Sequence, residues 1–159
     1  MKRNDYISWD TYFMGVAMLS SMRSKDPSTQ VGACIVNDKK RIVGIGYNGF
    51  PYGCEDDTFP WENNNSYLES KYPYVVHAEP NAILNASCSL EGATLYVTLF
   101  PCNECAKLII QSGIREIVYL SDKYNGTESD IASKRMFEAA KVKTRKMLPF
   151  RLDLHEGEV

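Results

Sequence analysis

Two short motifs, separated by a predicted strand, constrain the fold of this chain more than any other feature of its sequence. The first contains His77 and Glu79, and the second contains Pro101, Cys102 and Cys105. Each motif stands at the start of a segment with helical periodicity, where free N–H groups and the helix dipole favour anionic thiolates. One imidazole and two thiolates suit Zn²⁺, and a catalytic zinc keeps three protein ligands and one open position. The fold must therefore bring the starts of two helices to one point.

The rest of the chain predicts alternating helices and strands. A helical pattern over residues 9–24, with Ser8 as its N-cap, indicates a first amphipathic helix. Two segments rich in Val and Ile, 31–36 and 41–49, flank the polar sequence NDKK and predict a β-hairpin. Further along the chain we expect helices at 78–87, 102–113 and 128–141, and strands at 93–100, 114–120 and 142–148.

The strand patterns also predict the fold class. The apolar runs LYVTLF and IVYL lack alternation, which is typical of strands covered by helices on both faces. Strands alternating with helices after an opening hairpin indicate a three-layer α/β/α fold with a mixed five-stranded sheet. A length of 159 residues fits one domain, which we expect to span 1–159. Residues 52–72 show no regular pattern, and we expect them to form an irregular insertion over a site.

Composition narrows the possible partners and the compartment. No apolar run of membrane-spanning length and no secretory signal is visible, so we expect a cytoplasmic protein that does not enter membranes. The net charge of -2 provides no broad positive field for a nucleic acid polymer, which favours a small ligand. Five cysteines without an export signal indicate reduced thiols or metal ligands; we expect Cys34, Cys54 and Cys88 to be idle thiols.

The motif residues suggest a reaction. We expect His77, Cys102 and Cys105 to bind one zinc, and Glu79, two residues from His77, to shuttle protons beside a zinc-activated water. Pro80 fits the first turn of a helix that begins near Ala78, because a proline there removes no helical hydrogen bond. H-x-E followed by P-C-x-x-C is the signature of the zinc nucleobase deaminases, in which activated water attacks C4 of a cytosine.

Two other interpretations of the cysteine pair remain open. A C-x-x-C motif also occurs as a redox pair, although a redox motif needs no upstream H-x-E. A purely structural zinc site would need a fourth protein ligand, such as Cys54 or Cys88. Neither interpretation gives Glu79 a task.

Four segments together resemble the deoxycytidylate (dCMP) deaminase family, most closely its eukaryotic and viral members. They are SKDPSTQVGACIV, IVGIGYNGFPYGCEDD, KYPYVVHAEPNAI and LFPCNECAKLIIQSGIREIVYLSDKY, and the resemblance runs from about Trp9 to about Leu148. It implies a cytidine deaminase-like fold and hydrolytic deamination of dCMP to dUMP, which supplies thymidylate synthesis. It further implies a homohexamer that dCTP activates and that dTTP, with Mg²⁺, inhibits. Pro80 departs from the aliphatic residue usual in HAE-x-NA.

The resemblance also implies roles for individual residues. His77, Cys102 and Cys105 match the zinc ligands, and Glu79 matches the proton shuttle. Asn48 matches the asparagine that holds the sugar, while Ala78 and Tyr124 are expected to contact the nucleotide. Because a phosphate dianion needs positive charge or backbone donors, we expect it near Arg23, Ser24 and Lys25. The allosteric site is expected at Asn48, Gly49 and Phe50. No other cysteine accompanies Cys54 in its region to complete a second zinc site, which favours one zinc per chain.

Several alternatives stay open at this stage. The enzyme class includes a dCTP-accepting or bifunctional dCMP/dCTP deaminase, a free cytidine or cytosine deaminase, and a tRNA adenosine deaminase. The last is disfavoured because the tail lacks a basic patch for RNA. A non-catalytic, nucleotide-sensing homologue is a different class, and Glu79 argues against it because a structural zinc has no use for a proton shuttle.

Overall fold

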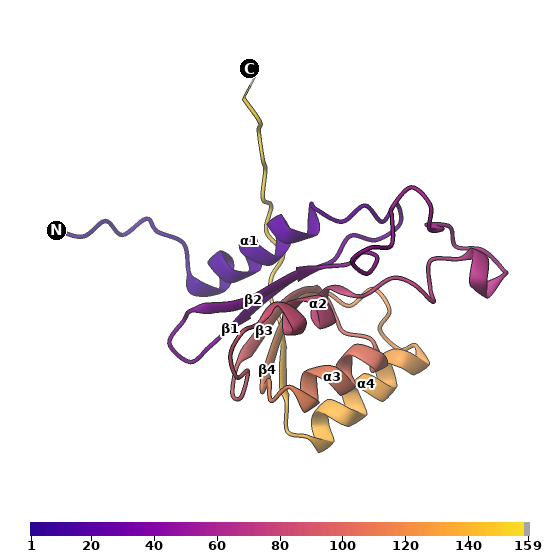
Figure 1. Ribbon diagram of the computed structural model, residues 1–159. Helices are drawn as coiled ribbons and strands as arrows, with labels where there is room; N and C mark the ends of the chain where they lie inside the picture. Colours follow the sequence, from indigo (N-terminus) through magenta and orange to yellow (C-terminus); the bar gives the residue numbers. More distant parts are fainter. Residues whose placement is uncertain (158–159) are drawn as a thin grey trace.

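The computed structural model describes residues 1–157, and it contains the helices and strands that the sequence predicts (Figure 1). One short 3₁₀ helix, η1, was not predicted. In chain order the elements are α1 Trp9–Ser21, β1 Gly32–Val36, β2 Ile42–Tyr47, η1 Tyr67–Glu69, α2 Ala78–Asn85, β3 Thr94–Leu99, α3 Asn103–Gln111, β4 Glu116–Ser121, α4 Glu128–Ala139 and β5 Lys143–Lys146.

The strands form one mixed five-stranded sheet in the order β2-β1-β3-β4-β5. β1 runs antiparallel to both β2 and β3, whereas β3, β4 and β5 run parallel to one another. Parallel neighbours require crossover connections, and α3 and α4 are those crossovers. The predicted mixed sheet is therefore confirmed.

Side chains that alternate along the central strands build two separate cores. Ala33, Ile35, Leu95, Val97 and Ile117 pack on the face that carries α2, α3 and α4. Cys34, Val36, Tyr96 and Val118 point to the opposite face and pack against α1. Figure 1 shows α1 on one side of the sheet with α3 and α4 on the other. This arrangement confirms the three-layer fold and explains why the strands lack a simple polar alternation.

Helix α2 lies unusually close to the edge strand β2. A Cβ atom on Gly44 would stand 2.4 Å from the carbonyl oxygen of Ala82, and one on Gly46 would stand 2.4 Å from the carbonyl oxygen of Ala78. Two amides of the helix cover the strand edge, since Asn81 Nδ2 donates to the Tyr47 carbonyl and Asn85 Nδ2 to the Ile45 carbonyl, each at 2.8 Å. Glycine at 44 and 46 thus fixes where α2 begins and ends relative to the sheet.

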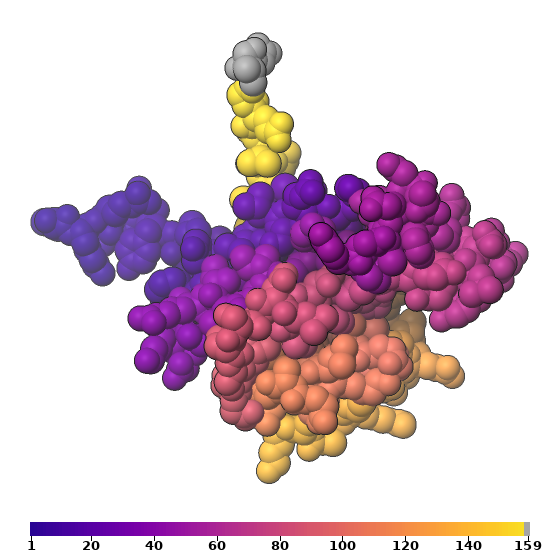
Figure 2. Space-filling model, viewed as in Figure 1, coloured from indigo at the N-terminus to yellow at the C-terminus, as the bar shows by residue number. Residues whose placement is uncertain are grey.

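The segment between β2 and α2 is irregular apart from η1, as predicted (Figure 2, the magenta lobe). It is held by packed aromatic rings, with Phe50 and Trp61 at 4.1 Å between centroids and Phe59 and Tyr74 at 5.2 Å. The bridge between Gly49 and Val76 closes its base. All five cysteines are free thiols. Within residues 1–157, no helix combines the length and apolar character needed to cross a membrane.

Candidate active site

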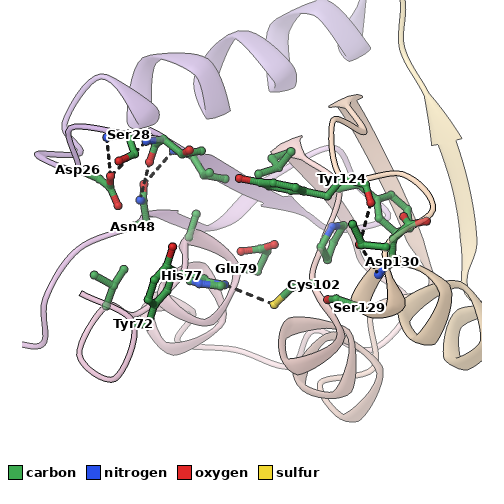
Figure 3. Close-up of a pocket in the computed structure, with 18 of the residues that line it drawn as sticks. Asp26, Ser28, Asn48, Tyr72, His77, Glu79, Cys102, Tyr124, Ser129 and Asp130 are labelled. Carbon is green, nitrogen blue, oxygen red and sulfur yellow. Dashed lines mark hydrogen bonds between the residues drawn. The ribbon is translucent and has the colours of Figure 1, made fainter. Parts of the chain in front are cut away.

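The two motifs meet at the N-termini of α2 and α3, as the sequence requires. His77 is the N-cap residue of α2 and Cys102 is the N-cap residue of α3, and neither side chain caps its own helix. By contrast, the N-caps Ser8 and Thr127 of α1 and α4 do accept a backbone hydrogen bond. The His77 and Cys102 side chains are therefore free to turn toward each other, and Figure 3 shows them doing so.

The geometry of these side chains fits a metal ion. His77 Nδ1 lies 3.2 Å from Cys105 Sγ and 3.5 Å from Cys102 Sγ. The three ligand atoms all lie within 4.8 Å of one another. Tetrahedral zinc with ordinary Zn–S and Zn–N bonds separates its ligand atoms by roughly 3.5–3.8 Å. One nitrogen and two sulfurs at this spacing suit zinc and leave a fourth position open.

The two thiols differ in their acidity because they differ in their surroundings. Hydrogen bonding from Cys105 and His77 lowers the pKa of Cys102 to about 4. The pKa of Cys105 is raised because its thiol donates to Cys102 and because the residue is buried. The pKa of His77 is raised by its hydrogen bond to Cys102. These surroundings therefore favour the thiolate form of Cys102, which is the form that binds a metal.

Glu79 lies in the first turn of α2 and is 4% exposed. Burial raises the pKa of its carboxyl to about 7. It borders the same cavity as His77 and Cys102. A carboxyl whose pKa lies near neutrality can both accept and donate a proton at the working pH.

A cavity of about 470 Å³ opens above the ligand cluster. This volume falls within the usual range for small-molecule sites. Four segments form its walls. They are the loop after α1, with Ser28 and Thr29, the irregular segment before α2, with Tyr72, the end of β3, with Phe100, and the loop before α4, with Thr127. Asn63, Lys71 and Tyr72 come from the irregular segment, so the predicted position of this segment over a site is confirmed.

Three of the predicted nucleotide contacts line this cavity, namely Asn48, Ala78 and Tyr124. Asn48 is buried, and its side chain braces the loop after α1: Oδ1 accepts from Val31 N at 2.8 Å and Nδ2 donates to Thr29 O at 2.9 Å. One amide hydrogen of Asn48 is left over after these bonds, and it is available to a ligand. Tyr124 is exposed at the cavity wall.

The other predicted contacts are not part of the cavity wall. Lys25 pairs with Asp56, and Ser24 Oγ donates to the Asn48 carbonyl. Arg23 follows α1. None of Arg23, Ser24 and Lys25 borders the cavity. Gly49 and Phe50 lie outside it as well, in the bridge to Val76 and in the aromatic cluster. The assignment of Arg23, Ser24 and Lys25 to the phosphate, and of Gly49 and Phe50 to an effector, stays a prediction.

Two polar pairs beside the cavity were missed by the sequence analysis. Lys71 Nζ donates to both carboxylate oxygens of Asp26 at 2.8 and 2.7 Å, and both residues are buried. Lys123 Nζ donates to Thr29 Oγ1 at 3.0 Å, which connects the loop before α4 to the loop after α1. The partners lie 45 positions apart in the first pair and 94 in the second, so no local sequence pattern indicates either pair.

Comparison with known proteins agrees with this geometry. Residues 7–121 match the family model of the cytidine and deoxycytidylate deaminase zinc-binding region. Deoxycytidylate deaminase of Mus musculus is 57% identical over 150 residues, which cover 93% of this chain and 84% of the mouse protein. The protein of the same description from Homo sapiens is 56% identical with the same coverage.

A solved structure shares the architecture. The dCMP deaminase of the cyanophage S-TIM5, in complex with dCMP and dUMP, superposes with a TM-score of 0.70 at 27% identity. The alignment covers 89% of this chain and all of the phage chain. The RibD protein of Acinetobacter baumannii is 22% identical with a TM-score of 0.62, and this similarity concerns the fold alone.

Proposed function

The chain belongs to the cytidine and deoxycytidylate deaminase family, and on that premise we propose that it hydrolyses dCMP to dUMP and ammonia. One observation carries the proposal: His77, Cys102 and Cys105 converge beside the buried Glu79 at one cavity of nucleotide size. The relatives at 56–57% identity are described as deoxycytidylate deaminases, and the phage structure contains dCMP and dUMP. These relatives favour the monophosphate over the free nucleoside.

We assign His77, Cys102 and Cys105 as ligands of one zinc ion per chain. Zinc bound at these residues supplies the activated water that attacks C4 of cytosine. The family match covers a zinc-binding region, and the nitrogen and sulfur spacing suits this ion. Cys54 and Cys88 do not belong to the ligand cluster, so a structural site with a fourth thiolate is not supported.

Glu79 is assigned as the proton shuttle. It accepts a proton from the attacking water and delivers it to the ring nitrogen, and a second transfer accompanies the departure of ammonia. Burial suits both directions of transfer, because the pKa of the carboxyl is raised to about 7. A non-catalytic sensing homologue would have no need of such a group.

The residues that line the cavity suggest how a nucleotide lies in it. We propose that the base binds at the ligand cluster and that the spare amide hydrogen of Asn48 binds the sugar. Asn48 binds the Thr29 carbonyl, and the Thr29 hydroxyl in turn accepts from Lys123. Lys71 is already neutralised by Asp26, whereas among residues 1–157 no carboxylate pairs with Lys123. We therefore place the phosphate near Thr29 and Tyr124, which line the cavity, and near Lys123, which is not a wall residue itself but donates to Thr29.

Regulation and assembly are further proposals that rest on the family resemblance. We propose a cytoplasmic homohexamer that dCTP activates and that dTTP inhibits, with Mg²⁺ accompanying the effector. Asn48, Gly49 and Phe50 are the proposed effector contacts. The bridge between Gly49 and Val76 ends next to His77, which gives an effector at this loop a short path to the catalytic helix.

The test is the loss of cytosine absorbance when zinc-loaded protein meets dCMP, dCTP, deoxycytidine or CMP. We expect fast conversion of dCMP by the wild-type protein. The rate should fall about 10²–10⁴-fold in Glu79→Gln, because this variant keeps the shape of the side chain and loses the acid. Equal turnover of dCTP would favour the bifunctional alternative. Zinc-loaded protein that binds dCMP and releases no ammonia would contradict the proposal and favour a sensing homologue. Stimulation by added dCTP tests regulation separately.

A further inference from the structure

Two serines of α4 contact the peptide groups on either side of Cys102. Ser133 Oγ donates to the Pro101 carbonyl at 3.0 Å, and this carbonyl belongs to the peptide that precedes Cys102. Ser129 Oγ accepts from the backbone N–H of Asn103 at 3.1 Å, and this N–H belongs to the peptide that follows Cys102. The Ser129 hydroxyl also donates to Asn103 Oδ1 at 2.9 Å. Both bonds to the backbone of the Cys102 turn therefore come from one neighbouring helix.

Cys102 depends on such support more than the other two cluster residues do. Cys105 lies in the first turn of α3 and is buried, so the helix and the surrounding core hold its backbone. Cys102 is the N-cap residue, half-buried, and its own extended φ and ψ lie outside the helix. Its carbonyl oxygen accepts from the Ala106 N–H at 2.9 Å, but no helical hydrogen bond holds the peptide that precedes it. A change of a few degrees at this residue moves its sulfur relative to His77 and Cys105.

The burial of the contact between Ser133 and Pro101 makes it a strong constraint. Ser133 is completely buried and Pro101 is almost completely buried, so water cannot replace the hydroxyl. Their spacing of four residues places Ser129 and Ser133 on one face of α4, directed at the start of α3. Figure 3 shows Ser129 beside Cys102, on the far side of that residue from His77.

We propose that Ser129 and Ser133 are positioning residues that hold Cys102 in its metal-binding geometry. The inference rests on the zinc site proposed above. Groups that orient a metal ligand without touching the metal typically contribute 10–100-fold to metal affinity. The two hydroxyls bind the backbone of the turn that carries Cys102. Their removal should therefore lower the affinity for the metal, even though neither hydroxyl contacts it.

The test measures zinc affinity by competition with a chromophoric chelator, together with the absorption spectrum of the cobalt-substituted protein. We expect Ser129→Ala and Ser133→Ala to weaken zinc binding about 10–100-fold and to alter the thiolate-to-cobalt charge-transfer band. Ser129→Thr, which keeps the hydroxyl, should retain wild-type affinity and spectrum. Ser112→Ala is the matched control, because its hydroxyl bonds the Ile109 carbonyl at the opposite end of α3.

The outcomes separate this inference from the zinc site itself. Folded Ser129→Ala and Ser133→Ala proteins with wild-type zinc affinity and cobalt spectrum would overturn the positioning role alone. A wild-type protein that binds no zinc would overturn the zinc site together with the inference. If the buried Ser133→Ala variant does not fold, the half-buried Ser129→Ala variant decides, with circular dichroism of the metal-free protein as the folding check.

Discussion

At the scale of single residues, Lys123 offers the clearest test of how the substrate phosphate is bound. Its ammonium group lies 3.0 Å from Thr29 Oγ1 and 5.0 Å from the centre of the Tyr124 ring. Hydrogen bonds to charged groups contribute about 1.5–3 kcal/mol, which corresponds to roughly 10–100-fold in affinity. We expect Lys123→Gln to raise KM for dCMP by about that factor and to leave deoxycytidine turnover unchanged.

Steady-state kinetics with both substrates measure this difference. Lys107→Gln is the matched control, since Lys107 is an exposed lysine of α3 that pairs with Glu104 away from the cavity. An equal loss for dCMP and deoxycytidine would mean that Lys123 supports the fold of the loop and does not bind phosphate. An unchanged KM for both substrates would contradict phosphate binding by Lys123 and would favour Arg23 and Lys25 as the phosphate contacts.

The site residues that motif spacing alone identifies are those whose separation is fixed by local structure. His77 with Glu79, and Cys102 with Cys105, stand within single helical turns, so their separation in the sequence determines their separation in space. Asp26 with Lys71 and Thr29 with Lys123 could not be identified in this way, because each pair is assembled by the fold from distant loops. The expected phosphate site at Arg23, Ser24 and Lys25 rests on charge and backbone donors alone, and the Lys25 ammonium pairs with Asp56.

At the scale of elements, the close contact between α2 and β2 makes Gly46 critical for the site. A Cβ on residue 46 would meet the Ala78 carbonyl and the Ala82 nitrogen at 2.4 Å, and both atoms belong to helix backbone that cannot rotate away. We expect Gly46→Ala to displace α2, lowering the free energy of unfolding by about 1–3 kcal/mol. Because Ala78 stands between His77 and Glu79, kcat/KM for dCMP should fall as well.

Urea unfolding and initial rates measure both effects. Gly15→Ala is the matched control: Gly15 lies inside α1, and no atom stands within 4 Å of an added Cβ. Its replacement should leave activity unchanged and stabilise the helix by about 0.5–1 kcal/mol. Wild-type stability and turnover in Gly46→Ala would show that α2 can move without disturbing the site.

The elements themselves were predictable because local signals agreed with the tertiary arrangement. Ser8 caps α1 as expected, and Gly113, with φ of 91°, ends α3. Each helix ends two or three residues before its predicted end, because terminal turns of helices fray and local patterns do not mark the last bonded residue. The course of the segment between β2 and α2 was beyond prediction, since packed aromatic rings and the Asp26–Lys71 pair determine it.

At the scale of the whole molecule, one charged network joins elements from both halves of the chain. Arg145 of β5 binds Asp10 of α1 through two hydrogen bonds of 2.7 and 2.8 Å, and it binds Glu116 of β4 at 2.7 Å. Tyr96 of β3 donates to Asp10 at 2.7 Å. The Arg145 guanidinium holds the pKa of Asp10 below its ordinary value.

This network predicts how stability depends on pH. Because the folded-state pKa of Asp10 lies below the unfolded value of about 3.9, its contribution is complete above about pH 4 and is lost as the pH falls through the folded-state pKa. We expect Asp10→Asn to lower the free energy of unfolding by about 1 kcal/mol at neutral pH. The value is small because the carboxylate is partly exposed to solvent. The difference from wild type should shrink below about pH 4.

Urea unfolding at about pH 6 and about pH 3 measures this dependence. Asp5→Asn is the matched control, since Asp5 pairs with Arg3 in a fully exposed segment and should leave stability unchanged at both pH values. A wild-type advantage over Asp10→Asn that persists undiminished at the lower pH would show that shape, and not charge, makes Asp10 important.

The two asparagine amides of α2 that cover the Tyr47 and Ile45 carbonyls have a consequence for the behaviour of the chain in a crowded cell. An uncovered edge strand is a template on which other chains can add strands and aggregate. Here the cover is the same helix that begins at His77 and carries Glu79. Damage that loosens this helix would abolish turnover and expose an adhesive edge in a single event, so inactive molecules would also be the ones most prone to precipitate and to be cleared.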